Sequence, residues 1–318
     1  MLILLTERLR LRWFADEDAA WLQRLLNDAD WLANIGDRGV RTEAAARSYV
    51  RDRLRAGCWQ QGFGFWMVER RADGERLGMC GLTHREGLPE PDLGFAFLPE
   101  FRGQGYAIEA ARGCLRYADE VLELDRVLAI TAPHNSRSAM LLTKLGMVVD
   151  PTAPRRDAEG EVVRHVWQRA QRRGCVGGEA GAAGDPAAID RLVARFYAAF
   201  DQRGPAPMTL PILPHLCVAQ VTFRRLAGDD CVVADLRTFV SERLDLFASE
   251  LEQFHEVEES SRTEVHGAMA QRWSVFRSRG RRRGEPFTVE GRKSMQFVRD
   301  RRGWRIASVL YSVEPTVQ

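Results

Sequence analysis

The chain has 318 residues, which is enough for two domains of ordinary size. Apolar residues make up 45% of the chain and aromatic residues 9%, the composition of a globular protein that can build a core in each half. The net charge of +2 is close to neutral and gives no reason to expect a nucleic acid or an acidic membrane as partner.

The number and positions of the lysine and cysteine residues bear on function and on metal binding. Lys144 and Lys293 are the only lysines, and we interpret this arginine preference as a bias of composition without functional meaning. The six cysteines are scattered and form no C-x-x-C pair, and no histidine pair has metal-ligand spacing. Free thiols in this arrangement suit a reducing cytoplasm and predict that the chain binds no metal.

Targeting and membrane signals are weak. The apolar run at the N-terminus is too short for a signal peptide, and no stretch approaches the ~18 apolar residues of a membrane span. We therefore expect a soluble cytoplasmic protein with neither membrane nor nucleic acid among its partners.

The first elements in chain order are a strand and two helices. Residues 7–13 alternate between apolar side chains and arginine, and this period of two predicts a half-buried strand. Asp16 is predicted to cap the helix that follows, and Thr42 to cap a second helix that ends at Gly57. The remaining predicted elements of the first half are strands over 63–69, 77–83 and 93–98, a helix to about 121, a strand over 127–132, a short helix ending before Gly146, and closing strands over 147–149 and 162–168.

Residues 92–107 are the most informative segment of the chain. They read as a short apolar strand, a glycine-punctuated turn and the start of a long amphipathic helix. The first N–H groups of a helix have no partner within it and carry partial positive charge. Gly103 and Gly105 present bare backbone, and the small Ala107 lets the helix begin close to the turn. The segment therefore predicts an anion-binding site that suits a phosphate.

The composition of the sequence changes over residues 171–185. This segment is rich in glycine and alanine and shows no periodic spacing of hydrophobic residues. This composition is typical of a linker, so we predict one domain over 1–170 and a second over 186–318. The second half begins with helices and ends with four long β-type runs. That order indicates an α+β domain in which helices cover one face of a curved antiparallel sheet.

The turn carries a recognisable motif. The hexapeptide Arg102-Gly103-Gln104-Gly105-Tyr106-Ala107 fits the pattern R/Q-x-x-G-x-G/A, and Asn135 and Ser138 follow in the right order. On these motifs, residues 3–169 resemble the GNAT family of acetyl-CoA-dependent N-acetyltransferases. The segment Thr-Glu-Arg-Leu-Arg-Leu-Arg over 6–12 looks like the RimJ/RimL branch, which acetylates protein N-termini. The resemblance implies an α+β fold with a mixed, splayed central sheet and flanking helices.

The resemblance also implies how acetyl-CoA, the expected co-substrate, is held. Backbone N–H groups of the turn would bind the pyrophosphate of coenzyme A. In this chain they belong to Arg102, Gly103, Gln104, Gly105, Tyr106 and Ala107. The strand ending near Leu98 would splay from the strand over 127–132, and the pantetheine arm would pair with exposed main chain of Phe95, Phe97 and Leu98.

The chemistry needs an amine that loses a proton and a thiolate that gains one. Family members often carry an acidic base at the head of the central strand, where this chain has Asp92; the alternative is a solvated turn residue, and Glu100 is a second candidate. Many members protonate the thiolate with a tyrosine, but the corresponding position here is Leu142. Ser138 is the expected substitute, unless it only supports its helix. Asn135 is expected to hydrogen bond the pantetheine amide or a strand end.

The acceptor is poorly specified by the sequence. In this family its site comes from the first two helices and their loop, here 28–42. That segment holds Asp28, Asp30, Trp31 and Asp37. These side chains would suit a cationic amine, and a solvated acidic loop explains them equally well. His134 could face the acceptor, although a lone histidine at a strand end is more often a surface residue.

Residues 186–315 resemble the NTF2-like (SnoaL-like) superfamily through the opening helix 189–197 and the closing pattern over 293–306. The resemblance implies a cone of curved sheet around a helix, with a pocket at its open end. Candidate lining residues are Tyr197, Trp273, Gln296 and Tyr311. Ordinary core packing explains them as well. The basic run 277–283 lacks interleaved aromatic residues and is predicted to be a solvated hairpin tip.

These observations predict an N-acetyltransferase that uses acetyl-CoA to acetylate a primary amine, either a protein N-terminus or a small molecule. We expect direct attack in a ternary complex, and a homodimer formed through the NTF2-like domain. Two alternatives stay open. The first domain could hold acetyl-CoA without turning it over and act as a sensor, or the second domain could act as an isomerase or cyclase on a small molecule.

Overall fold

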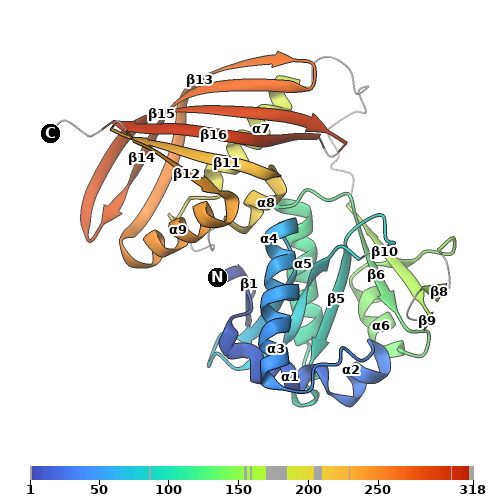
Figure 1. Ribbon diagram of the computed structural model, residues 1–318. Helices are drawn as coiled ribbons and strands as arrows, with labels where there is room; N and C mark the ends of the chain where they lie inside the picture. Colours follow the sequence, from blue (N-terminus) through green and yellow to red (C-terminus); the bar gives the residue numbers. More distant parts are fainter. Residues whose placement is uncertain are drawn as a thin grey trace. The chain divides into compact units, whose positions relative to one another are not determined.

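The computed structural model describes residues 2–85, 87–153, 156–157, 160–169, 185–203, 210–228, 230–301 and 303–314. The chain divides into two units, Met1–Arg172 and Arg173–Gln318, which we describe separately (Figure 1). The predicted linker over 171–185 lies almost entirely outside the described residues.

The first unit is built on an eight-stranded mixed sheet. Its strands, in spatial order, are β1 (Leu2–Leu5), β2 (Leu9–Arg12), β3 (Phe65–Arg70), β4 (Arg76–Thr83), β5 (Asp92–Phe97), β6 (Arg126–Thr131), β10 (Val163–Gln168) and β7 (Val148–Val149). Consecutive strands from β1 to β5 are antiparallel, β5 and β6 are parallel, and β10 lies antiparallel between β6 and β7. The short strands β8 (Arg156–Asp157) and β9 (Gly160–Glu161) pair separately. The mixed sheet is the one predicted from the sequence. The prediction missed β1, whose four apolar residues show no alternation.

The helices of this unit are α1 (Ala19–Leu26), α2 (Ala29–Asn34), α3 (Glu43–Tyr49), α4 (Ala56–Gln61), α5 (Tyr106–Glu120) and α6 (Ser136–Lys144). Thr42 caps α3 as predicted, since its Oγ1 accepts a hydrogen bond from the N–H of Ala45. The predicted end at Gly57 is wrong, because a π-helical segment, Val50–Arg55, leads from α3 into α4. The helical stretch ends at Gly62, whose φ of +78° is the left-handed conformation that closes many helices.

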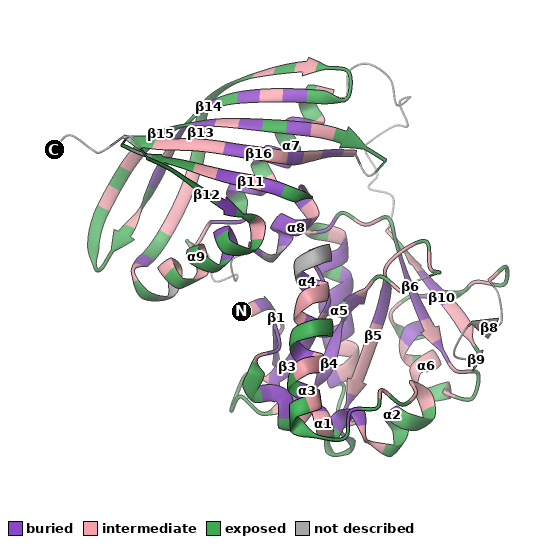
Figure 2. Cartoon of the chain, viewed as in Figure 1, coloured by how far each residue is buried: buried purple, intermediate pink, exposed green. Residues whose placement is uncertain are grey.

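Two apolar cores lie on the two faces of the sheet. On one face, α5 packs through residues such as Ala111 and Tyr117, and the Tyr117 ring meets Trp66 of β3 edge-on at 5.2 Å. On the other face, α1 and α3 cover Met67 and Met79. Along β2, Leu9 and Leu11 are buried and Arg10 is exposed, which follows the predicted period of two. Figure 2 shows mostly buried residues along α5. The sheet is therefore held rigidly from both sides.

The cap predicted for Asp16 is wrong, since its side chain makes no capping bond. Asp18, two residues later, has the structural role and is completely buried. Its carboxylate accepts two hydrogen bonds from Arg12 at 2.7 and 2.9 Å, and it lies 2.9 Å from Nε of Arg76. The N–H of Ala15 donates to it as well, at 2.8 Å. Asp18 thus ties the first helical turn to β2 and β4.

The second unit is a six-stranded sheet with helices. Its strands are β11 (Cys217–Ala227), β12 (Asp230–Asp235), β13 (Leu251–His266), β14 (Met269–Arg282), β15 (Glu285–Asp300) and β16 (Gly303–Glu314), in the order β12-β11-β16-β15-β14-β13. Its helices are α7 (Asp185–Ala198), α8 (Leu213–Leu216) and α9 (Leu236–Ser249). An antiparallel sheet was predicted for this unit. The structure departs from that prediction at one pair of strands, because β11 and β16 run parallel. None of the described helices of either unit is long and apolar enough to cross a membrane.

The inner face of this sheet is the one that packs against α7 and α9. On it, the Phe223 ring of β11 stacks on Phe239 of α9 at 3.9 Å. Trp273 and Gln296 were candidates for lining an interior pocket, but both are exposed. The reason is the strand period of two, which places each of them on the opposite face from its buried neighbours. The basic run over 277–283 was predicted to be a solvated hairpin tip, but the structure places only its end there, because residues up to Arg282 belong to β14 and Ser278 is buried.

The structure predicts that Asp18→Ala destabilises the first unit by about 1.5–3 kcal/mol, because it removes the charged hydrogen bonds that the buried carboxylate makes with Arg12, Arg76 and the N–H of Ala15, although Arg12 keeps its pair with Glu69. Asp16→Ala is the matched control: its pair with Arg55 is solvent-exposed and contributes at most about 1 kcal/mol. Denaturant unfolding of the two variants measures both losses. Equal losses would contradict the role assigned to Asp18.

Candidate active site

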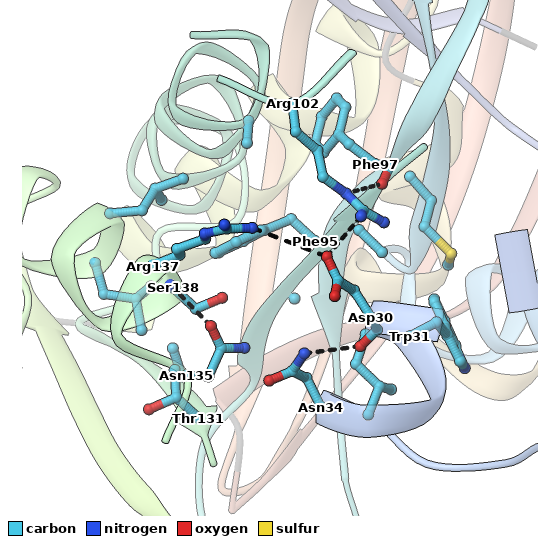
Figure 3. Close-up of a pocket in the computed structure, with 18 of the residues that line it drawn as sticks. Asp30, Trp31, Asn34, Phe95, Phe97, Arg102, Thr131, Asn135, Arg137 and Ser138 are labelled. Atoms are coloured by element: carbon cyan, nitrogen blue, oxygen red, sulfur yellow. Dashed lines mark hydrogen bonds and ion pairs between the residues drawn. The ribbon is translucent and has the colours of Figure 1, made fainter. Parts of the chain in front are cut away.

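The strands β5 and β6 are neighbours in the sheet but pair at only one point. Asp92 is in register with Leu128, and the N–H of Leu128 donates to the carbonyl of Pro91 at 2.8 Å. No further pair between these two strands is found in the described part of the chain. Phe95 of β5 and Thr131 of β6 both line the cavity that results (Figure 3).

Main-chain groups of alternate residues in a strand point to opposite sides. The N–H of Leu98 donates to the carbonyl of Leu77 in β4, whereas the carbonyl of Pro91 accepts a hydrogen bond from Leu128 of β6. By this alternation, Phe95 and Phe97 direct their main-chain groups toward β6, where the strands have parted. The predicted role of Leu98 is wrong, because its N–H is already bonded and its side chain is buried.

The turn between β5 and α5 has both glycines in the left-handed region, with φ of +75° at Gly103 and +81° at Gly105. Other residues adopt this conformation only under strain. The amides from Gly103 to Ala107 have no hydrogen-bond partner among the described residues, and they stand at the start of a 15-residue helix. Such amides bind anions. The amide of Arg102 is not one of them, contrary to prediction, because it donates to the carbonyl of Pro99 at 3.2 Å.

The side chain of Arg102 bridges the turn, β5 and α2. Its Nε donates to the carbonyl of Phe97 at 2.8 Å and its Nη1 donates to Asp30 at 2.6 Å, while Nη2 donates to Asp28 (Figure 3). A second guanidinium, that of Arg137, lies 4.0 Å from Asp30. Arg102 therefore fixes the position of the turn and already has two carboxylate partners.

A second arginine braces the turn from the other side. Nη1 of Arg8 donates to the carbonyl of Gln104 at 3.1 Å, and its guanidinium lies over the Tyr106 ring at 4.6 Å. Its Nε pairs with Glu109 of α5 at 2.7 Å. The segment that resembles the RimJ/RimL branch thus supports the turn directly.

The cavity between the parted strands has a volume of about 1070 Å³. The predicted site residues that line it are Asp92, Phe95, Phe97, Arg102, Gly103, Gly105, Tyr106, Ala107, Asn135 and Ser138. Leu98 and Gln104 are absent from the lining; Gln104 is exposed, and its side-chain amide donates to the carbonyl of Glu100. No group of three or more His, Cys, Asp or Glu side chains among the described residues is arranged to hold a metal ion.

Asp92 begins β5 and is only 1% exposed, which excludes the solvated-turn alternative. Its Oδ2 lies 3.3 Å from Nη2 of Arg85, and its Oδ1 has no partner among the described residues. Burial raises the pKa of Asp92, and the positive charge of Arg85 partly opposes this effect. Asp92 is therefore a buried acid in the cavity lining, and its unbonded Oδ1 is buried as well. Glu100, the other candidate base, is exposed and pairs with Arg24 at 2.7 Å.

Asn135 and Ser138 lie together at the start of α6. Asn135 is the N-cap, and its Oδ1 accepts a hydrogen bond from the N–H of Ser138 at 3.1 Å. Ser138 is half-buried and lines the cavity, as does Leu142 one turn later. Both roles considered for Ser138 thus remain available to it: its backbone supports the helix start, and its side chain lies at the cavity.

Sequence analysis missed a polar pair beside the cavity. Oγ1 of Thr131 and Nε2 of His165 are 3.3 Å apart, and both residues are buried. Burial lowers the pKa of His165 and favours its neutral form. Both residues come from apolar strands, and only the register of β6 with β10 brings them together. A histidine next to apolar residues of a predicted strand was the available signal.

The acids predicted to meet the acceptor are already paired. Those of α2 bond to Arg102, and Asp37 pairs with Arg41 and accepts a hydrogen bond from the N–H of Gly39 at 2.8 Å. Trp31 is buried, and its Nε1 donates to the carbonyl of Gly36. The structure therefore favours the alternative in which Asp37 belongs to a solvated loop. His134 lines the cavity with an exposed side chain.

Comparison with known proteins agrees with this geometry. The acetyltransferase (GNAT) domain family matches residues 8–148. The uncharacterized protein YkkB of Bacillus subtilis is 34% identical over 149 residues, which span 45% of this chain and 84% of that protein. The FsC-acetyl coenzyme A-N(2)-transacetylase of Aspergillus fumigatus is 34% identical over 130 residues, 35% of this chain and 54% of that protein. The crystal structure of an acetyltransferase from Agrobacterium tumefaciens is 28% identical, covers 53% of this chain and 96% of its own, and has a TM-score of 0.47. The matched region contains the parted strands and the glycine turn, and the N-terminal half of this chain belongs to the GNAT family of acetyltransferases.

Proposed function

We propose that the first unit transfers the acetyl group of acetyl-CoA to a primary amine by direct attack in a ternary complex. The observation that carries this proposal is the convergence of three features on one cavity. These are the open amides of the glycine turn, the unpaired edge of β5 at Phe95, and the buried carboxyl of Asp92. The relative from Aspergillus fumigatus, named as an acetyl coenzyme A transacetylase, supports the donor.

The amides of Gly103, Gly105, Tyr106 and Ala107, which line the cavity, would hold the pyrophosphate, because N–H groups at a helix start favour an anion without a cationic side chain. Lys144 also lines this cavity and adds positive charge near its α6 side. The main chain of Phe95 would pair with the pantetheine arm in place of the missing strand. These contacts would bring the thioester carbonyl between the parted strands and hold it still for attack.

Asp92 is the proposed base. The attacking nitrogen forms a bond to the thioester carbonyl carbon, the carbon–sulfur bond breaks, and the nitrogen loses one proton. A carboxyl with a raised pKa accepts that proton and remains buried without a large penalty. Ser138 is the proposed hydrogen-bond donor to the departing sulfur, because Leu142 offers no polar group there.

The acceptor is proposed to be a protein N-terminus or a small-molecule amine with few positive charges. The support is electrostatic: the acids that line the cavity from α2 are neutralised by Arg102, and Asp92 faces Arg85. A polycation would find no uncompensated carboxylate to bind there.

For the second unit we propose an NTF2-like fold that dimerises, joined to the first by the linker predicted over 171–185, of which Asp185 already belongs to α7, within a cytoplasmic protein. Its support is the long helix α7 packed on a six-stranded sheet of mostly antiparallel hairpins.

Gly105→Val is expected to weaken coenzyme A binding by at least about tenfold, equivalent to about 1.4 kcal/mol. The branched side chain would occupy the space in front of the turn, and its Cβ would lie 3.3 Å from Nη2 of Arg8. Isothermal titration calorimetry with coenzyme A measures the change. Gly146→Val is the control, since its φ of +80° imposes the same backbone strain away from the cavity. Equal affinities for the two variants would count against the turn as the pyrophosphate site.

Asp92→Asn is expected to lower kcat/KM for amine acetylation by about 10²–10⁴-fold, because the amide cannot accept the proton. In the unaltered protein, activity should rise with pH as Asp92 ionises. The midpoint should lie above the ordinary value of about 3.9, since burial raises this pKa. Thiol release with an amine panel measures both effects.

Glu100→Gln, at an exposed carboxylate, is the control and should leave the rate unchanged. Tight coenzyme A binding without thiol release for any amine would favour the sensor alternative.

A further inference from the structure

The second unit has a pocket of its own, which the proposed acetyl transfer does not use. Its volume is about 620 Å³, within the range of pockets that take small ligands. The segment after α7 and the strands β13, β14 and β15 contribute its lining, which consists of Arg203, Gln253, His255, Gly280, Arg281 and Pro286. Two of these side chains are arginines and one is a histidine, and none of the described lining residues is a carboxylate. The composition of the lining therefore favours an anion.

An irregularity in β13 forms one wall of this pocket. Between the pairs that β13 makes with Arg281 and Arg279 of β14, two residues of β13 lie opposite the single Gly280. This is a β-bulge, and within it Gln253 has a φ of +53°, a conformation that is strained for a residue other than glycine. A Cβ on Gly280 would lie 3.1 Å from Cα of Phe254, so the absence of a side chain there lets the bulged strand approach β14 closely. Bulges redirect side chains and are frequent beside functional sites.

The segment after α7 is fixed to this bulge by two hydrogen bonds. The N–H of Gln202 donates to the carbonyl of Phe254 at 2.7 Å, and the N–H of Phe254 donates to Oε1 of Gln202 at 3.2 Å. These bonds place the next residue, Arg203, at the pocket. Its Nη2 pairs with Oδ2 of Asp201 at 2.6 Å. Asp201 thus orients Arg203 and neutralises its charge.

Arg281 supplies positive charge that the described residues do not neutralise. It belongs to the basic run at the end of β14, and its neighbours Arg282 and Arg283 share the carboxylate of Glu250. Nε of Arg281 donates to the carbonyl of Gly284 at 3.0 Å, and no carboxylate of the described residues pairs with this guanidinium. One nitrogen therefore holds the side chain in place, and both Nη groups remain for a ligand.

His255 provides a second observation. Its Nδ1 is buried and has no hydrogen-bond partner among the described residues. A buried N–H without an acceptor is unfavourable, so the proton of the neutral ring belongs on Nε2. Nε2 bonds to nothing in the described chain and, unlike Nδ1, is not buried. His255 therefore offers a hydrogen-bond donor to the pocket that its side chain lines.

The groups that a ligand can reach here are mainly donors, carried by separate strands. Guanidinium groups bind phosphate and carboxylate oxygens in pairs. Donors on both β13 and β14 suit a tetrahedral phosphate, whose oxygens point in several directions, better than a planar carboxylate. We propose that this pocket binds a small organic phosphate through its phosphate group, with Arg281 and His255 as the principal contacts. The volume exceeds that of a phosphate ion and leaves room for the organic part beside Pro286.

A solvated surface is the ordinary explanation of a basic run. It accounts for Arg282 and Arg283, which are exposed and pair with Glu250. It does not account for the strained conformation of Gln253 or for the unbonded imidazole of His255. The pocket lies wholly within the second unit, so this proposal does not depend on the acetyl transfer proposed for the first.

Modification of arginine by phenylglyoxal tests the site in the full-length protein. Phenyl phosphate is the probe, and mass spectrometry of peptides measures the rate at each arginine separately. Saturating phenyl phosphate should slow the modification of Arg281 at least about tenfold, because only the unliganded site reacts. Arg262 of β13 is exposed, pairs with Glu264 and should react at an unchanged rate, so it is the internal control. Equal slowing of Arg281 and Arg262, or no slowing of Arg281, would overturn the proposal.

Two further measurements test the identity of the contacts. Benzoate at the same concentration should protect Arg281 several-fold more weakly, and equal protection would contradict the preference for phosphate. His255→Phe should weaken the protection of Arg281 by phenyl phosphate several-fold while Tm stays unchanged, since the ring nitrogens bond to nothing in the described chain. Unchanged protection in this variant would remove His255 from the site and contradict the proposal.

Discussion

The single backbone pairing of Asp92 with Leu128 is the constraint on which the acetyltransferase unit depends. It joins β5 and β6 at one end and leaves them apart at the other. Two parallel strands that paired along their full length would close the cavity, and two strands with no pairing would not share a sheet. Because the apolar cores on both faces hold the sheet rigid, the gap is a fixed feature of the fold. The same pairing buries Asp92 at the closed end, so the geometry that opens the cavity also raises the pKa of its acid.

The glycine turn is positioned by arginines, and its anion-binding capacity resides in its backbone. Arg102 connects the turn to α2 and Arg8 connects it to α5, each through carboxylates that already neutralise the guanidinium. The side chain of Arg102 therefore has a positioning role. Main-chain amides have fixed directions and no rotamer freedom to lose, so they are well suited to hold a flexible ligand in one place.

The second unit departs from the usual separation of polar and apolar faces. Its inner face combines aromatic side chains of α7 with a connected set of ions on β13, β14 and β15. Arg272 is held by Glu258 and Asp190 and is saturated with partners. Lys293 has a single carboxylate and is otherwise surrounded by rings.

Local residue patterns were sufficient for much of the fold. The alternation over 7–13, the Thr42 cap, the hairpin at 65–83 and the strand–turn–helix over 92–120 depend on interactions between residues close in the chain, and the structure has all of them. The prediction of a helix end failed where more than one glycine lies near the end of the helix. Gly57 was predicted to end the helix, but the left-handed conformation that ends it lies five residues later, at Gly62.

The sequence by itself determined the glycine turn, the order of elements and the chemistry of the candidate residues, because these are encoded within short segments. Only the tertiary structure decided which of them meet. The register of β5 directs the main-chain groups of Phe95 toward β6 and pairs the N–H of Leu98 with β4. The pairing of β6 with β10 brings Thr131 next to His165. The packing of α7 on the sheet places three aromatic rings around Lys293. Contacts between residues far apart in the chain depend on register and packing over the whole unit, and no single segment carries that information.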